Sequence, residues 1–289
     1  MKVADIITVA IVSVIVVTLA VRSAAEVPVA DDLLLHGALL VGYAALIRFL
    51  SRFPETGWVS LVRGAAVIGV MFTLYTTLGH VAFEAIPWTG DAALASLDRV
   101  LFLGASPVLL MAPHIGPENL EIFAFIYALF IPYLYMSIFL GLIGRPGPER
   151  EAFVTGFALL YAASFFGYLF VPARGPVVYQ AADFQSALSG GFFYDLVTSS
   201  IDRMGGPHGA FPSLHVGASV FACAFDLRHN RLRGLIYLPI VLAIAVSTVA
   251  LRYHYVIDLL AGLALALLAM RLGHAWTASQ QAGNGSGAS

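Results

Sequence analysis

Eight stretches of the chain are apolar over about the 20 residues that a helix needs to cross a lipid bilayer. Some are joined by short turns that contain arginine, and others are separated by long polar stretches. This alternation predicts an all-α fold, namely a polytopic bundle of about eight transmembrane helices. We place the spans at residues 3–22, 32–50, 62–86, 118–144, 150–172, 213–228, 233–251 and 255–272.

Three other segments complete this organisation. The first span is longer than the apolar region of a typical signal peptide and lacks a clear cleavage site, so we expect it to be retained. Residues 91–104 have the pattern of an amphipathic helix at the membrane interface, although an ordinary loop helix would show the same pattern. We divide the chain into two N-terminal transmembrane helices (1–60), a membrane core (61–275) and a disordered cytoplasmic tail (276–289).

The composition supports a chain that is solvated by lipid. Hydrophobic residues make up 60% of the sequence and charged residues 11%, whereas soluble domains carry about 25% charged residues. The net charge of −2 gives no basic field, so we expect no nucleic-acid partner. Cys223 is the single cysteine of the sequence, which excludes an internal disulfide.

The basic residues predict which side of the membrane each loop faces. Short cytoplasmic loops are enriched in Lys and Arg. With eight spans, one side is basic and should be cytoplasmic, so both termini are predicted to lie inside. The long stretches 87–117 and 173–212 then face the extracytoplasmic side. The basic side contains Lys2, Arg48, Arg52, Arg145, Arg150, Arg228, Arg231, Arg233 and Arg271.

The segment LRYHYVID, residues 251–258, contains the first candidate chemistry. His254 and Asp258 are four residues apart at a predicted helix start, so they should share one face of the helix. A carboxylate there can accept the Nδ1–H of the imidazole and leave Nε2 as a directed nucleophile or base. A structural His–Asp pair at a helix end would have the same spacing.

The segment GAFPSLHVG, residues 209–217, contains a second histidine. Pro212 and Ser213 are typical of a helix start, and a helix N-terminus favours the binding of phosphate. His215 falls in the first turn of that helix. A lone histidine is more often structural, but the predicted topology places His215 and His254 on the same side of the membrane.

Two arginines supply positive charge for a phosphate. Arg174 lies between two prolines in FVPARGPVVYQ, residues 170–180, and Arg252 is two residues before His254. The guanidinium group suits bidentate binding of phosphate. Contact with lipid head groups is the alternative for either side chain.

These motifs together resemble the type 2 phosphatidic acid phosphatase superfamily. That family has a basic motif with Arg-Pro, a second motif Pro-Ser-Gly-His and a third that ends in His-x-x-x-Asp. This sequence has PSLH at residues 212–215 and HYVID at residues 254–258. The resemblance covers about residues 60–272, and it implies a six-helix phosphatase-like core.

The departures from this pattern affect the predicted reaction. The first motif reads ARGP at 173–176 without the usual upstream lysine, Leu214 replaces glycine, and Thr248 stands where arginine is usual. The form FPSLH followed by HYxxD is more similar to the inositol phosphorylceramide synthases and their bacterial relatives, which transfer a phosphorylated head group between lipids. The resemblance therefore implies a lipid phosphotransferase, with a phosphatase acting on phosphatidic acid or polyprenyl (di)phosphate as the alternative.

The resemblance also implies the role of each catalytic residue. His254 attacks phosphorus to form a phosphohistidine-type intermediate, Asp258 orients it, and His215 moves the proton. Ser213, Arg174 and Arg252 bind the phosphoryl oxygens. The motifs lack a carboxylate cluster for magnesium, so we expect no metal and no cofactor.

A small transporter with a histidine proton relay is a further alternative. Transporter sites usually lie near the bilayer midplane and often accompany inverted repeats. Here the histidines are at helix ends and no repeat is evident. The expected partners are a phospholipid or lipid-phosphate substrate and membrane lipids; the oligomeric state is left open, a homo-oligomer included.

Overall fold

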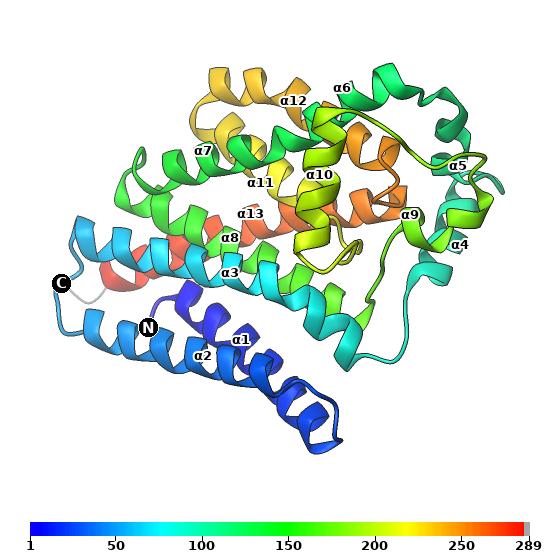
Figure 1. Ribbon diagram of the computed structural model, residues 1–289. Helices are drawn as coiled ribbons and strands as arrows, with labels where there is room; N and C mark the ends of the chain where they lie inside the picture. The colour runs from blue at the N-terminus through cyan, green and yellow to red at the C-terminus, as the bar shows by residue number, and fades with distance from the viewer. Residues whose placement is uncertain (286–289) are drawn as a thin grey trace. The chain divides into compact units, whose positions relative to one another are not determined.

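The computed structural model describes residues 1–285, apart from the side chains of residues 79–85 and 280–285. Helices account for the secondary structure of this part of the chain, and it contains no strand (Figure 1). The helices are α1 (Val3–Ala24), α2 (Ala30–Leu50), α3 (Gly57–Ala85), α4 (Asp91–Leu101), α5 (Pro107–Met111), η1 (Ala112–His114), α6 (Pro117–Ala128), α7 (Phe130–Leu142), α8 (Gly147–Phe170), α9 (Pro176–Tyr179), η2 (Ala181–Asp183), α10 (Phe192–Arg203), α11 (Leu214–His229), α12 (Arg231–Ala250) and α13 (Val256–Gly285).

The predicted class, a polytopic helical membrane protein, is confirmed. Seven helical segments of the described chain are long and apolar enough to cross a bilayer. The predicted span 213–228 corresponds to α11, but its 16 residues give a length of about 24 Å, less than the roughly 30 Å of a hydrocarbon core. The seven segments are Val3–Ala24, Ala30–Leu50, Gly57–Leu78, Pro117–Leu142, Gly147–Phe170, Arg231–Ala250 and Val256–Ser279.

Two predicted segments differ from the observed helices. The span predicted at 118–144 is divided into α6 and α7 at Leu129. Pro132 explains the break, because proline lacks the N–H that would bond to the carbonyl of Ala128 and its ring crowds that carbonyl.

At the other end of the chain, α13 continues to Gly285, ten residues into the segment that we predicted to be disordered. Alanine and glutamine favour this extension of an existing helix, and residues 286–289 lie outside the described residues.

The chain divides into two compact units. Unit 1 contains Met1–Ala85, Met136–Phe165 and the chain from Leu267 onward, and unit 2 contains Ile86–Tyr135 and Phe166–Ala266. Helices α7, α8 and α13 therefore contribute residues to both units. In unit 1 the two N-terminal helices pack with α3, and the boundary at residue 60 stays a prediction.

In unit 1, α1 and α2 lie side by side and both pack on α3 (Figure 1). Ile11, Ile15 and Leu19 are buried at a spacing of four residues, which gives α1 an apolar stripe along one face. A Cβ atom on Gly273 would lie 2.6 Å from the Ala152 carbonyl oxygen. Glycine therefore lets the backbones of α13 and α8 approach closely, as small residues commonly do between membrane helices.

Unit 1 also buries an ion pair. The Asp5 side chain is fully buried in α1, and it forms an ion pair with Arg63 of α3. Its other oxygen accepts a hydrogen bond from the Tyr43 hydroxyl at 3.0 Å. A buried charge inside a membrane segment is unfavourable unless it is paired, so this network fastens α1, α2 and α3 together.

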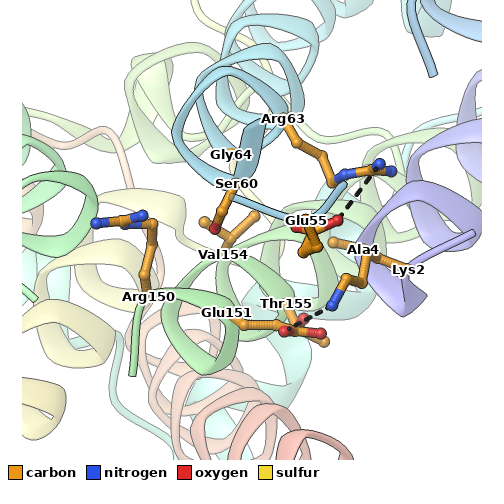
Figure 2. Close-up of a pocket in the computed structure, with 10 residues that line it drawn as sticks. All are labelled: Lys2, Ala4, Glu55, Ser60, Arg63, Gly64, Arg150, Glu151, Val154 and Thr155. Carbon is orange, nitrogen blue, oxygen red and sulfur yellow. Dashed lines mark hydrogen bonds and ion pairs between the residues drawn. The ribbon is translucent and has the colours of Figure 1, made fainter. Parts of the chain in front are cut away.

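A small pocket lies beside this ion pair in unit 1 (Figure 2). Two of its cations form ion pairs with carboxylates: Lys2 Nζ lies 3.0 Å from Glu151 Oε2, and an Arg63 nitrogen lies 3.9 Å from Glu55 Oε2. The third, Arg150, donates to the Gly57 carbonyl at 3.2 Å. Figure 2 shows both pairs at the pocket wall. Since its positive side chains are already engaged, this pocket shows the features of a structural ion-pair network rather than those of an anion site.

In unit 2, α11 packs on α12, and both α12 and α10 pack on α6. The start of α11 is closely enclosed. A Cβ atom on Gly167 of α8 would lie 2.3 Å from Pro212 Cδ, and one on Gly262 of α13 would lie 2.4 Å from the Ser213 carbonyl oxygen. Two glycines thus let α8 and α13 approach the segment that precedes His215.

Candidate active site

The three segments singled out in the sequence come together within unit 2. The backbone N–H of Ala210 donates to the Ala173 carbonyl at 3.1 Å, and the N–H of Val177 donates to the Arg252 carbonyl at 2.7 Å. The His254 ring bonds to the Ala210 carbonyl, which joins the second segment to the third. Segments that are far apart in the sequence thus form one hydrogen-bonded cluster.

His254 lies in the turn between α12 and α13, and its side chain is buried. Its Nδ1 is 2.9 Å from the Ala210 carbonyl oxygen and 3.4 Å from Asp258 Oδ2. Both neighbours accept hydrogen bonds, so Nδ1 carries the proton of the neutral ring. Nε2 then presents a lone pair, and it lies 3.3 Å from Ser213 Oγ.

Asp258 is close to His254 as predicted, but its geometry differs from the prediction. The nearer acceptor for Nδ1 is the Ala210 carbonyl, and Asp258 Oδ2 also accepts the N–H of Tyr255 at 2.9 Å. This arises because α13 begins at Val256, so His254 precedes the helix instead of lying on its first turn. Asp258 therefore caps the turn that presents His254 while placing negative charge beside the ring.

Ser213 and His215 occupy the helix start that was predicted. Ser213 is the N-cap of α11, and its Oγ accepts the N–H of Val216 at 3.4 Å. His215 lies in the first turn with its ring centroid 5.7 Å from that of His254. The rings of Tyr127 and Phe130 each lie 4.5 Å from the His215 ring, so the second histidine has the first on one side and aromatic carbon on others.

Arg174 is held in this cluster by its backbone, while its side chain is exposed. Its N–H donates to Asp91 Oδ2 at 3.0 Å. The next residue, Gly175, has a φ of +84°, and a Cβ atom there would lie 2.2 Å from the Tyr253 carbonyl oxygen. Glycine is therefore required next to Arg174 for the first segment to approach the residue before His254.

Arg252 is placed differently from the prediction of a phosphate ligand. Its guanidinium carbon lies 3.8 Å from the centroid of the Phe184 ring, and its Nη1 donates to the Ser186 carbonyl at 2.9 Å. The side chain is buried, and burial lowers its pKa. Arg252 thus anchors the loop before α10, and its role as a phosphate ligand stays a prediction.

Two aspartates of α4 contact the site, and neither was among the site residues predicted from the sequence. Asp91 accepts the N–H groups of Arg174 and Gly175 at 3.0 and 2.9 Å. Asp98 accepts those of Val256 and Ile257 at 2.9 and 2.8 Å. Burial raises the pKa of the Asp98 carboxyl, and the two N–H groups oppose that rise.

The amphipathic helix predicted at 91–104 is observed as α4, with an unusual distribution of polarity. Asp91, Leu94, Ala95 and Asp98 form its buried face, whereas Val100 is exposed. The carboxylates thus face the protein interior. Their spacing of seven residues was the available signal, because it places both on one face of a helix.

Helix α10 was not predicted from the sequence, and it packs on α6 in unit 2. The Glu121 carboxylate of α6 accepts the N–H groups of Gly191, Phe193 and Tyr194 at 2.7, 3.0 and 3.1 Å. These are free donors at the helix N-terminus, where a carboxylate also interacts favourably with the helix dipole. Glu121 therefore fixes α10 against α6, the helix whose Tyr127 contacts His215.

Comparison with known proteins agrees with the motif analysis. Residues 92–272 match the family model described as the PAP2 superfamily. A PA-phosphatase related-family protein of Dictyostelium discoideum is 30% identical over 133 residues, which is 45% of this chain. The chain spans 24% of the length of that relative. No solved structure matches the chain.

Proposed function

The chain belongs to the PAP2 superfamily, and on that premise we propose that it is a membrane enzyme that transfers a phosphorylated head group between lipids, like an inositol phosphorylceramide synthase. The observation that carries this proposal is the paired arrangement of His254 and His215. The His254 ring has Nδ1 between two acceptors and Nε2 facing Ser213 Oγ at 3.3 Å, and the His215 ring lies 5.7 Å away, centroid to centroid.

In the first step, His254 Nε2 attacks phosphorus and the bond to the leaving lipid oxygen breaks. His215, protonated at this stage, gives its proton to that oxygen. The Ala210 carbonyl and Asp258 hold the Nδ1 proton and balance the charge that develops on the ring. Arg174, the Ser213 hydroxyl and the N–H groups at the start of α11 stabilise the phosphoryl oxygens.

In the second step, an acceptor hydroxyl attacks the phosphorus of the His254 adduct. His215, now neutral, takes the proton of the acceptor, and the bond between phosphorus and Nε2 breaks. Both histidines return to their starting protonation states. The nature of the acceptor decides the reaction class: a lipid hydroxyl gives transfer and water gives hydrolysis.

Two observations support transfer to a lipid. The motif FPSLH resembles that of the head-group transferases, with Leu214 in place of the glycine of the phosphatases. In addition, the rings of Tyr127 and Phe130 pack against His215. Aromatic carbon beside the proton-transferring group favours an apolar acceptor molecule over bulk water. The basic residues of the short loops support an extracytoplasmic position for this site.

Hydrolysis of a lipid phosphate is the second candidate function. The relative in Dictyostelium discoideum is named as a PA-phosphatase related-family protein, which favours this chemistry. The same residues would act in the same order, with water as the acceptor in the second step. The difference between the two candidates lies in the acceptor and not in the catalytic groups.

A substrate screen with purified wild type and His254→Ala tests the proposal. The donors are phosphatidic acid, polyprenyl diphosphate and phosphatidylinositol, each with ceramide or diacylglycerol as acceptor. The expected result is a labelled head group on the acceptor lipid, formed by wild type alone. Release of inorganic phosphate without labelled lipid would replace transferase with phosphatase, and equal activity of His254→Ala would refute both.

A further inference from the structure

Helix α4 joins the two segments that carry the proposed chemistry. Asp91, in its first turn, bonds to the two consecutive N–H groups beside the Arg174 side chain. Asp98, in its last turns, bonds to the two consecutive N–H groups that open α13, directly after His254 and Tyr255. The Tyr255 hydroxyl donates to Asp91 Oδ1 at 3.1 Å, which adds a link between the two ends.

An aspartate suits both positions because each side chain bonds to two backbone N–H groups. Asp91 and Asp98 are 2% and 1% exposed, so each has lost the hydration of its charge. A carboxylate has two oxygens and can accept from two N–H donors at once, and such charge-assisted bonds are stronger than neutral ones. Each side chain thereby fixes the course of two successive peptide groups, which a salt bridge to a flexible side chain would not do.

The helix sets the distance between these two attachments. Seven residues of α-helix give a rise of about 10 Å. Since α4 is a continuous helix from Asp91 to Leu101, the Arg174 segment and the start of α13 are attached to one rigid element. We propose that Asp91 and Asp98 are positioning residues, which hold the phosphate-binding segment and the nucleophile segment at the separation that phosphoryl transfer needs.

This inference rests on the proposed function and predicts different kinetic effects at the two positions. Asp91 acts through Arg174, which contacts phosphate both in the bound substrate and in the transition state. Asp98 acts through the turn that aims His254, whose bond to phosphorus forms only in the transition state. Loss of the Asp91 carboxylate should therefore weaken substrate binding, whereas loss of the Asp98 carboxylate should lower the turnover rate.

The test compares Asp91→Asn and Asp98→Asn with the exposed carboxylate of α10 as the matched control, Asp195→Asn. Each purified protein is assayed for kcat, KM and the inhibition constant of orthovanadate, a phosphate transition-state analogue. An inhibition constant does not depend on how much of the enzyme is active, so a loss of folded protein does not change it.

For Asp91→Asn we expect KM and the vanadate constant to rise together by about 10-fold, as expected when a charge-assisted hydrogen bond is lost. For Asp98→Asn we expect kcat to fall and the vanadate constant to rise by about the same factor, with KM nearly unchanged. Alanine at either position should have a larger effect than asparagine, which keeps one acceptor oxygen. Asp195→Asn should match wild type.

The inference is overturned if the vanadate constant stays at the wild-type value in both asparagine variants while only the amount of active enzyme falls. The aspartates would then merely stabilise the fold. Failure of the proposed function is separable, because it shows in His254→Ala: if that variant keeps full activity, the chemistry assigned to His254 is wrong whatever the aspartates do.

Discussion

The buried aspartate of helix α1 in unit 1 and the two buried aspartates of helix α4 in unit 2 have different kinds of partner. In unit 1, the buried Asp5 pairs with the Arg63 guanidinium and the Tyr43 hydroxyl. In unit 2, Asp91 and Asp98 bond to backbone N–H groups of other segments. Side-chain partners fasten one helix to another, whereas backbone partners fix the path of a loop.

This difference indicates what each unit contributes. The charges of unit 1 compensate one another, at the buried pair and at the pocket beside it (Figure 2). In unit 2, Asp91 and Asp98 bond to the backbone of the segments that contain Arg174 and His254. Substitution of Asp91 or Asp98 should therefore change KM, kcat or the vanadate inhibition constant, whereas substitution of Asp5 should change only stability.

The largest effect on catalysis is expected from substitution of His215 in unit 2. Without its proton donor, departure of an alkoxide is severely slowed, so His215→Ala should lose about 1,000-fold in kcat on a lipid substrate. For the first release of p-nitrophenol from p-nitrophenyl phosphate, a leaving group that needs no proton, the loss in rate should be much smaller.

The contrast between the two substrates is the measurement that matters for His215. His254→Ala provides the control, since loss of the nucleophile should reduce both activities to the same extent. If His215→Ala reduced the two activities equally, then His215 would not be the proton donor.

An intermediate effect is expected at the two arginines of unit 2. Arg174→Ala should lower kcat/KM by about 100-fold, because a phosphate ligand is removed. Arg252→Ala should lower kcat/KM far less and should instead lower the melting temperature, because its guanidinium holds Phe184 and Ser186. Assays of kcat/KM together with thermal melts in detergent separate the two. Equal kinetic losses would restore Arg252 as a phosphate ligand.

The smallest effect on catalysis is expected in unit 1. Asp5→Asn removes the nearer counter-charge of Arg63 and leaves only Glu55 at 3.9 Å, which should destabilise the protein by up to about 3 kcal/mol. The melting temperature should fall while KM and the vanadate inhibition constant stay at their wild-type values. A rise in either constant would show that the ion-pair network of unit 1 does more than hold helices together.

Much of the helical architecture could be predicted because hydropathy alone determines it. Long apolar runs gave the membrane class and most of the spans. The exceptions have physical reasons: α11 has too few residues to span a bilayer by itself, and Pro132 divides one long apolar run into α6 and α7. Helix α10 is short and amphipathic, so nothing in its hydropathy separated it from a loop.

The residues of the candidate site could be predicted where the side chains themselves make up a sequence motif. His215, His254, Ser213 and Asp258 lie together, as their motifs predicted. The contacts of His254 with the Ala210 carbonyl and of Asp91 and Asp98 with N–H groups were not predictable, since every residue has these backbone groups. The direction of the Arg252 side chain could not be predicted either, because proximity to His254 in the sequence does not determine where a long side chain points.

If His254 carries the phosphorylated group during turnover, the phosphohistidine adduct can be trapped. Protein is mixed with radiolabelled p-nitrophenyl phosphate and quenched in alkali, where a phosphorus–nitrogen bond on histidine survives. We expect label on the peptide that contains His254, with more label in His215→Ala because breakdown of the adduct lacks its base, and none in His254→Ala. Undiminished label in His254→Ala, or none in either wild type or His215→Ala while p-nitrophenol is released, would contradict this role of His254.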